Sequence, residues 1–231
     1  MRFGGTSVMG SYHEKNQDSI LAEKVAGGWL IAASDGVGCC EYSELGSALA
    51  CDAAKSAILR FGGMPDDVDR FFRELHTEWI NGIASLPEIH LNSECYATLL
   101  FCYLRDNRIF AARLGDGIVG IRTDGQNFLL FDDKKELLDN ETECLFEEHI
   151  PEAWEVLLLE YDSFEGAVIA TDGLSLVPHE KSVYNGFVND LISGYNDVSA
   201  QDIVADMQSW LPQWESDDDK SIVFLMGEQS R

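Results

Sequence analysis

Two apolar segments, far apart in the chain, end in the same way. Residues 29–34 and 167–171 consist almost entirely of apolar and small side chains, and they run directly into Asp35-Gly36 and Asp172-Gly173. A short apolar run of this kind predicts a strand that is buried on both faces. The glycine that follows each aspartate lets the backbone turn or approach a ligand closely. The chain is therefore expected to hold two carboxylates at the ends of buried strands.

Two further acidic groups flank predicted strands. Asp18 lies just before the predicted strand 19–25, and residues 217–219 are three aspartates just before the predicted strand 221–226. Close carboxylates cannot all stay ionised unless a cation compensates them. Oxygen-only ligation favours Mg²⁺ or Mn²⁺ over Zn²⁺. A single Asp-Gly is more often a turn, as we expect at Asp124-Gly125, so the prediction of a cation site depends on the joint pattern.

The order of the predicted elements indicates the fold class. Strands at 3–9, 19–25 and 29–34 precede helices at 41–61 and 66–83. Strands at 94–104, 108–114, 118–123 and 127–131 are expected to form an antiparallel meander, and residues 132–148 are expected to be an irregular acidic insertion. The chain continues with strands at 154–161 and 166–171, helices at 181–193 and 199–211, and the strand at 221–226. This order predicts an α+β fold, a four-layer α/β/β/α sandwich of two mostly antiparallel sheets flanked by helix pairs, in one domain over 1–231.

Composition limits the partners and the compartment. The chain carries 16 Lys and Arg against 41 Asp and Glu, a net charge of −25. Nucleic acid and anionic membranes would be repelled, so we expect neither as a partner. We find no signal-peptide core, no apolar stretch of membrane-spanning length and no CxxC pair among the six cysteines, which are expected to be reduced. We therefore expect a cytoplasmic monomer.

Six motifs occur in an order that resembles one enzyme family. They are residues 10–18, 33–38, 96–100, 112–117, 170–174 and 218–221. Together they resemble the metal-dependent type 2C Ser/Thr protein phosphatases, and most of all the small bacterial members. The resemblance extends over about residues 4–226.

The resemblance implies the same sandwich and a dinuclear Mn²⁺ or Mg²⁺ centre between the sheets. It implies that Asp35 bridges both ions, that the Gly36 carbonyl binds one, that Asp172 and Asp218 bind the other, and that Asp18 lies behind these ligands. A water shared by the ions would attack phosphorus in line, while the ions stabilise the developing charge. The implied substrate is a protein phosphorylated on Ser or Thr by a cognate kinase.

Several positions depart from the family pattern. His13 stands where an Arg usually holds the substrate phosphate, and it could do so only while protonated, with Lys15 assisting; a loop histidine bonded to backbone is the alternative. Val37 stands where some members have a histidine that donates a proton. Asp116 is present for a third ion, but Leu176 occupies the place of a further aspartate, so that third site is incomplete.

Two other functions stay open at this stage. The chain could be a pseudophosphatase that binds phosphoproteins or a kinase without turnover, or a Ca²⁺-binding or structural protein with an acidic surface. Retention of the core aspartates favours the enzyme. Two divalent cations would add positive charge at the site itself, and the remaining acidity would select basic segments around the phosphosite.

Overall fold

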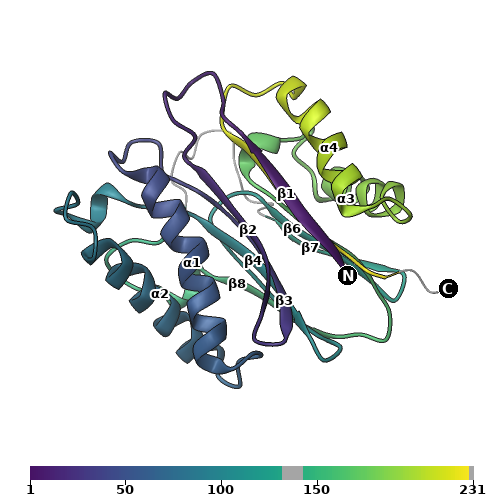
Figure 1. The fold of residues 1–231 in the computed structure, drawn as a ribbon, viewed down its shortest axis with the longest axis horizontal. Helices are drawn as coiled ribbons and strands as arrows, with labels where there is room; N and C mark the ends of the chain where they lie inside the picture. Colours follow the sequence, from purple (N-terminus) through teal and green to yellow (C-terminus); the bar gives the residue numbers. More distant parts are fainter. Residues whose placement is uncertain (132–142, 229–231) are drawn as a thin grey trace.

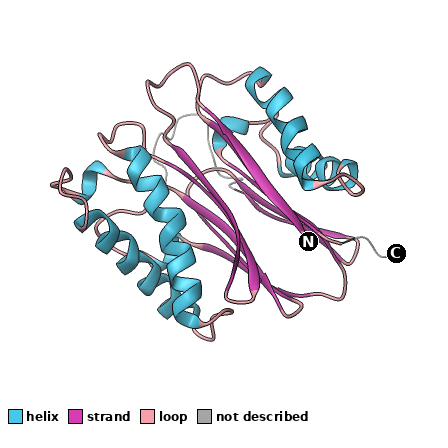
Figure 2. Cartoon of the chain, in the orientation of Figure 1, coloured by secondary structure: helices cyan, strands magenta, loops and turns pink. Residues whose placement is uncertain are grey.

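The computed structural model describes residues 1–131 and 143–228. Two five-stranded antiparallel sheets stack face to face, with helices outside both (Figures 1 and 2). The first sheet has the order β1 (Arg2–Val8), β10 (Lys220–Met226), β9 (Phe164–Ala170), β6 (Ile118–Thr123) and β7 (Gln126–Phe131). The second has the order β2 (Asp18–Val25), β3 (Gly28–Asp35), β4 (Leu99–Arg105), β5 (Arg108–Leu114) and β8 (Glu155–Glu160).

A helix pair covers the outer face of each sheet (Figure 1). Helices α1 (Ser43–Phe61) and α2 (Val68–Ala84) pack on the second sheet, and α3 (Lys181–Gly194) and α4 (Ala200–Trp210) pack on the first. Short 3-10 helices occupy Asn92–Glu94, Pro151–Ala153, Asp172–Leu174 and Leu211–Gln213. The predicted α/β/β/α sandwich of the α+β class is confirmed.

Three apolar layers hold the sandwich together. One lies between the sheets, and each of the other two lies between a sheet and its helix pair. Helix α1 presents small side chains to the second sheet, since Ala50, Ala54 and Ala57 are fully buried, and this lets the helix approach closely. Helix α2 adds bulk with Phe71 and Trp79, also fully buried. Burial of such aromatic side chains supplies much of the stabilisation of a core.

The predicted meander over residues 94–131 is wrong. Strands β4 and β5 pair in the second sheet, whereas β6 and β7 pair in the first. Between β5 and β6 the chain crosses from one sheet to the other through Gly115-Asp116-Gly117, and both glycines have positive φ, 94° and 97°. Only glycine adopts such angles without strain. An apolar strand pattern does not indicate which sheet a strand joins, so the crossing could not be predicted from the sequence.

The turn predicted at Asp124-Gly125 is confirmed. Asp106-Asn107 and Asp124-Gly125 are two-residue hairpin turns with positive φ at both positions, as type I′ turns require. The hydroxyl of Ser199 accepts a hydrogen bond from the Asp202 amide at 3.2 Å and caps α4. Of the insertion at 132–148, residues up to 142 lie outside the described part, and Leu145 pairs with Ala97. No helix in residues 1–131 and 143–228 is long and apolar enough to cross a membrane.

Candidate metal centre

Four aspartates from four strands meet at one end of the sandwich. Asp35 ends β3, and Asp18 begins β2 directly opposite it in the antiparallel register. From the other sheet, Asp172 follows β9 and Asp218 precedes β10. Burial raises the pKa of Asp35 well above its ordinary value, and the neighbouring charges of Asp18, Asp172 and Asp218 raise it further. The structure thus brings together acids that are widely separated in the sequence.

Asp18 is the most deeply buried of the four. Its carboxylate Oδ2 accepts a hydrogen bond from the Thr171 hydroxyl at 2.8 Å, while Oδ1 is buried without a hydrogen-bond partner among the described residues. Burial raises the Asp18 pKa to about 7. A buried carboxylate oxygen that lacks a partner is costly, and a divalent cation between the sheets would offset that cost. The donor set, all carboxylate oxygens, fits Mg²⁺ or Mn²⁺.

The backbone around Asp35 is held by β4 and by the residues just before it. The Asp35 amide donates to the Thr98 hydroxyl at 2.9 Å, and the Thr98 amide donates to the Asp35 carbonyl at 2.8 Å. The next residue, Gly36, has no room for a side chain, because a Cβ there would lie 2.4 Å from the Ser43 carbonyl oxygen. This close packing keeps the Asp35-Gly36 turn in one conformation.

Asp219 has a role that the sequence analysis did not assign. Its Oδ1 accepts a hydrogen bond from the Gly10 amide at 2.7 Å, and its Oδ2 accepts one from the Gln17 amide at 2.6 Å. Both bonds tie the N-terminal loop, which includes His13, to the segment before β10. Asp219 is buried, with 2% exposure, whereas the Asp218 side chain beside it is 45% exposed.

His13 points its Nδ1 atom at this acidic segment. Nδ1 lies 3.2 Å from Asp219 Oδ2 and 3.7 Å from Asp218 Oδ1, so its ring partners are carboxylates rather than backbone. A Cβ added to Gly38 would lie 3.5 Å from His13 Nε2, which places the second nitrogen near the loop after Asp35. Among the described residues, His13, Asp218 and Asp219 bring three potential ligand atoms within 4.8 Å of one another.

Lys15 lies in a different setting. Its ammonium pairs with Glu44 in the first turn of α1, and the hydrogen bond and charge of Glu44 raise the Lys15 pKa. The side chain is 65% exposed. The structure therefore places Lys15 in an exposed ion pair. Neither Lys15 nor His13 is among the residues that line the cavity described next.

A cavity of about 510 Å³ opens beside Asp35. Its lining residues are Asp35, Val37, Gly38, Tyr96, Thr98, Asp116, Glu143, Cys144, Phe146 and Asp172. Asp116 is brought there by the glycine crossing between the sheets. Three of these positions, Glu143, Cys144 and Phe146, belong to the segment that was predicted to be an irregular insertion, so sequence reasoning missed them.

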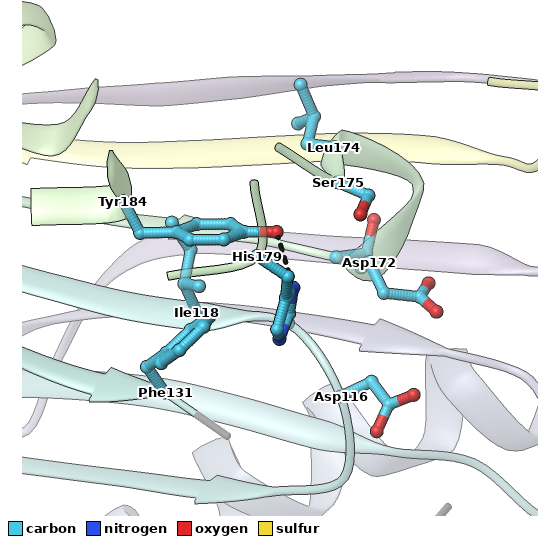
Figure 3. Close-up of a pocket in the computed structure, with 10 residues that line it drawn as sticks. Asp116, Ile118, Phe131, Asp172, Leu174, Ser175, His179 and Tyr184 are labelled. Carbon is cyan, nitrogen blue, oxygen red and sulfur yellow. Dashed lines mark hydrogen bonds between the residues drawn. The ribbon is translucent and has the colours of Figure 1, made fainter. Parts of the chain in front are cut away.

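Asp116 and Asp172 also border a second, smaller cavity (Figure 3). In Figure 3 both carboxylates point away from Tyr184, whose hydroxyl lies 3.1 Å from His179 Nδ1. Leu176, the residue in the place of a further aspartate, packs against the apolar cluster under α3 and α4. Asp116 and Asp172 thus supply the carboxylates at this opening, and position 176 supplies none.

The sequence profile of protein phosphatase 2C matches residues 10–214. This chain belongs to the protein phosphatase 2C family. The match includes each of the aspartates at 18, 35, 116 and 172, and it ends shortly before Asp218. No curated protein matches the chain.

Several solved structures with a similar fold are phosphatases. A bacterial serine phosphatase is 12% identical with a TM-score of 0.71, over 100% of this chain and 99% of that one. The serine/threonine phosphatase Stp1 from Staphylococcus aureus is 12% identical with a TM-score of 0.70, over 99% and 96% of the two chains. The catalytic domain of PstP, in complex with two manganese ions, is 15% identical with a TM-score of 0.65, over 99% and 98%. At these identities the likeness shows a shared fold.

Proposed function

We propose that this phosphatase 2C family member hydrolyses phosphoserine and phosphothreonine in proteins with the help of two Mn²⁺ or Mg²⁺ ions. The observation that carries the proposal is the convergence of Asp18, Asp35, Asp172 and Asp218, from both sheets, beside a cavity of about 510 Å³. Family membership and the manganese-containing relative support it. Cytoplasmic location, a monomeric state and a cognate kinase remain predictions.

We assign the two ions to the carboxylates and one backbone group. Asp35 would bridge both ions, the Gly36 carbonyl would bind one, and Asp172 and Asp218 would bind the other. Asp18 would lie behind them. When bound, two such ions make a shared water acidic enough to act near neutral pH and stabilise the charge that develops on the phosphoryl oxygens. A further ion at Asp116 would lack the carboxylate that Leu176 replaces.

The remaining residues position these groups. Thr98 holds the backbone of Asp35, and Thr171 holds one oxygen of Asp18. Asp219 lies 3.2 Å from His13 Nδ1 and would orient the ring, so that Nε2 would be the nitrogen available to a substrate phosphate. Burial raises the pKa of Cys144 to about 11, so this cavity-lining thiol stays protonated near pH 7 and is a poor nucleophile.

A pseudophosphatase is the second candidate, and one observation favours it. Of the described residues that line the cavity, none is Lys or Arg, and His13 stands where the family usually has an Arg. Phosphate binding without a fixed cationic side chain depends on the ions and on the protonation of His13. Turnover, rather than binding, separates the two candidates.

The test is Mn²⁺ titration of the metal-free protein with para-nitrophenyl phosphate as substrate. We expect activity that depends on Mn²⁺ and that Asp35→Ala abolishes. Asp124→Ala is the matched control, since it alters the other kind of Asp-Gly, a hairpin turn at the opposite end of β6. Mn²⁺ binding without turnover would support the pseudophosphatase, and neither binding nor turnover would support a structural protein.

A further inference from the structure

Three chain segments lie edge to edge along one wall of the cavity. Gly36 pairs with Ala97, and Ala97 pairs with Leu145, both antiparallel. The pairing is closed by hydrogen bonds from the Val37 amide to the Tyr96 carbonyl at 2.9 Å and from the Leu145 amide to the Ala97 carbonyl at 2.8 Å. Gly36, Ala97 and Leu145 are buried, so this middle row faces the core.

Neighbouring residues in paired extended segments face the opposite way. The two rows on either side of the buried one therefore face the cavity, and all six of their members line it: Asp35, Thr98 and Cys144 in one row, and Val37, Tyr96 and Phe146 in the next. The first row includes the aspartate proposed to bridge the ions. The second row is an apolar and aromatic strip immediately beside it.

The aromatic strip has an acidic edge. The rings of Tyr96 and Phe146 lie 6.3 Å apart, edge to face, and the Tyr96 hydroxyl donates a hydrogen bond to Glu147. Glu143 lines the same cavity and, like Glu147, is exposed. Two bound divalent ions would balance the aspartates beneath. Glu143 borders the cavity next to Cys144, and Glu147 adjoins the strip through its bond to Tyr96.

We infer that this strip is a specificity subsite for an Arg or Lys side chain close to the phosphorylated residue of the substrate. A planar guanidinium can stack on the Tyr96 and Phe146 rings while its N–H groups pair with the Glu143 and Glu147 carboxylates. The inference rests on the proposed function, because it places the phosphate beside Asp35. It deepens that function by naming the substrate class as basic phosphopeptides.

The geometry also sets the position of the basic residue. The strip and the Asp35 row are separated by the buried row, so they lie two residues apart along each segment. At about 3.3 Å per residue this is a distance of about 6.6 Å. An extended substrate advances by a similar rise per residue, so a side chain about two positions from the phosphoserine reaches the strip. Basic residues much farther along the peptide would be attracted to the acidic surface only weakly, because salt screens charges at that distance.

The experiment compares short phosphoserine peptides that differ only two positions from the phosphoserine, with Arg, Gln or Glu there, on either side. Binding by calorimetry in Mn²⁺ and turnover of each peptide are both measured. We expect the Arg peptide to be preferred over the Gln peptide about tenfold and the Glu peptide to be the poorest. Glu143→Gln combined with Glu147→Gln is expected to reduce the Arg preference to about threefold or less.

Matched variants test the two parts of the subsite. Tyr96→Leu is expected to reduce the Arg preference, whereas Tyr96→Phe, which keeps the ring, is expected to preserve most of it. Glu148→Gln removes the same charge from the next residue, which is exposed and is not the acceptor of the Tyr96 hydrogen bond, and is expected to leave the preference unchanged. An equal response to Glu148→Gln would mean that general surface charge, and not the strip, selects the peptide.

The failure of the subsite and the failure of the proposed function give different results. Wild-type protein that hydrolyses para-nitrophenyl phosphate but treats Arg and Gln peptides alike overturns the subsite alone. Protein that hydrolyses nothing but still binds the Arg peptide more tightly keeps the subsite and overturns the enzyme. Equal binding of all three peptides overturns the subsite whether or not the protein is active.

Discussion

Asp18 and Asp35 face each other as directly paired residues of β2 and β3. Like charges directly opposite in an antiparallel pair are destabilising. Here burial raises the pKa of both carboxyls, and the charge of Asp18 raises that of Asp35 further. A sheet would not keep this pairing for stability alone. The pair supports the proposed cation site, and it leads to the first two predictions.

Metal-free protein is expected to lose stability as the pH rises from about 4 to about 7. The Asp18 pKa is about 7 in the folded state against an ordinary 3.8, so the folded state binds more protons in this range and the free energy of unfolding falls with rising pH. Asp18→Asn removes this pH-dependent loss of stability, while the amide oxygen of the new side chain can still accept a hydrogen bond from Thr171. In EDTA, the variant should gain about 2–3 kcal/mol over wild type between pH 5 and pH 8, since each pKa unit corresponds to about 1.36 kcal/mol.

Urea unfolding at the two pH values measures this difference. Asp124→Asn, in a hairpin turn, serves as the control and should differ from wild type by the same amount at both pH values. A gain for Asp18→Asn that does not change with pH would show that the Asp18 carboxyl is not held at a raised pKa.

Mn²⁺ is expected to raise the melting temperature of the metal-free protein at pH 7.5, and Asp172→Asn should remove most of that increase. Binding to the folded state at about one hundred times the dissociation constant contributes about 2.7 kcal/mol. Thermal melting with and without Mn²⁺ reads out binding independently of activity. An unchanged Mn²⁺ response in Asp172→Asn would remove this aspartate from the ligand set.

Gly117→Ala is expected to destabilise the protein by about 2 kcal/mol or more and to disturb Asp116. Gly117 has a φ of +97°, and a Cβ there would lie 2.5 Å from the Ala170 carbonyl oxygen, so strain and collision add. Gly125→Ala is the control, because Gly125 has a φ of +71° but no atom near its Cβ, and it should cost about 1 kcal/mol. Urea unfolding of both variants checks the order, and equal losses would contradict the crossing argument.

Iodoacetamide at pH 7.5 is expected to label Cys39 first and to leave phosphatase activity within about twofold of the untreated enzyme. Cys39 is exposed, whereas burial raises the pKa of Cys95 and Cys144 to about 11 and that of Cys102 to about 12. Only the thiolate reacts readily. Mass spectrometry of peptides from treated protein identifies the labelled thiols. Loss of activity that tracks labelling of Cys144 would show that this thiol is accessible and reactive.

Local sequence patterns were sufficient to predict the helices and sheets of the four-layer sandwich. The apolar run before Asp35 predicted a buried strand, and helices were predicted at 41–61 and 66–83; the structure has β3, α1 and α2 at these places. The meander failed for a physical reason. Strands β4 to β7 have similar apolar patterns, and the two glycines around Asp116, which redirect the chain into the other sheet, also suit an ordinary turn.

The site residues also fall into those that the sequence predicts and those that only the structure identifies. Asp35 and Asp172 could be singled out from the sequence because each follows an apolar run and precedes a glycine. The sequence around Asp218 and Asp219 does not distinguish the two residues. Only the structure shows that both carboxylate oxygens of Asp219 accept hydrogen bonds from the backbone amides of Gly10 and Gln17. Phe146 had no local signal at all, since its place on the cavity depends on the pairing of Leu145 with Ala97.

The amino-acid order alone therefore determined which segments are strands and helices, and which carboxylates end up at strand ends, because both follow from the periodicity of burial and from the conformational freedom of glycine. Which sheet each strand joins, which acids become neighbours and which side chains form the wall of the cavity were decided by long-range pairing. Such pairing depends on the free energy of the whole packed core, and no short stretch of residues contains that information.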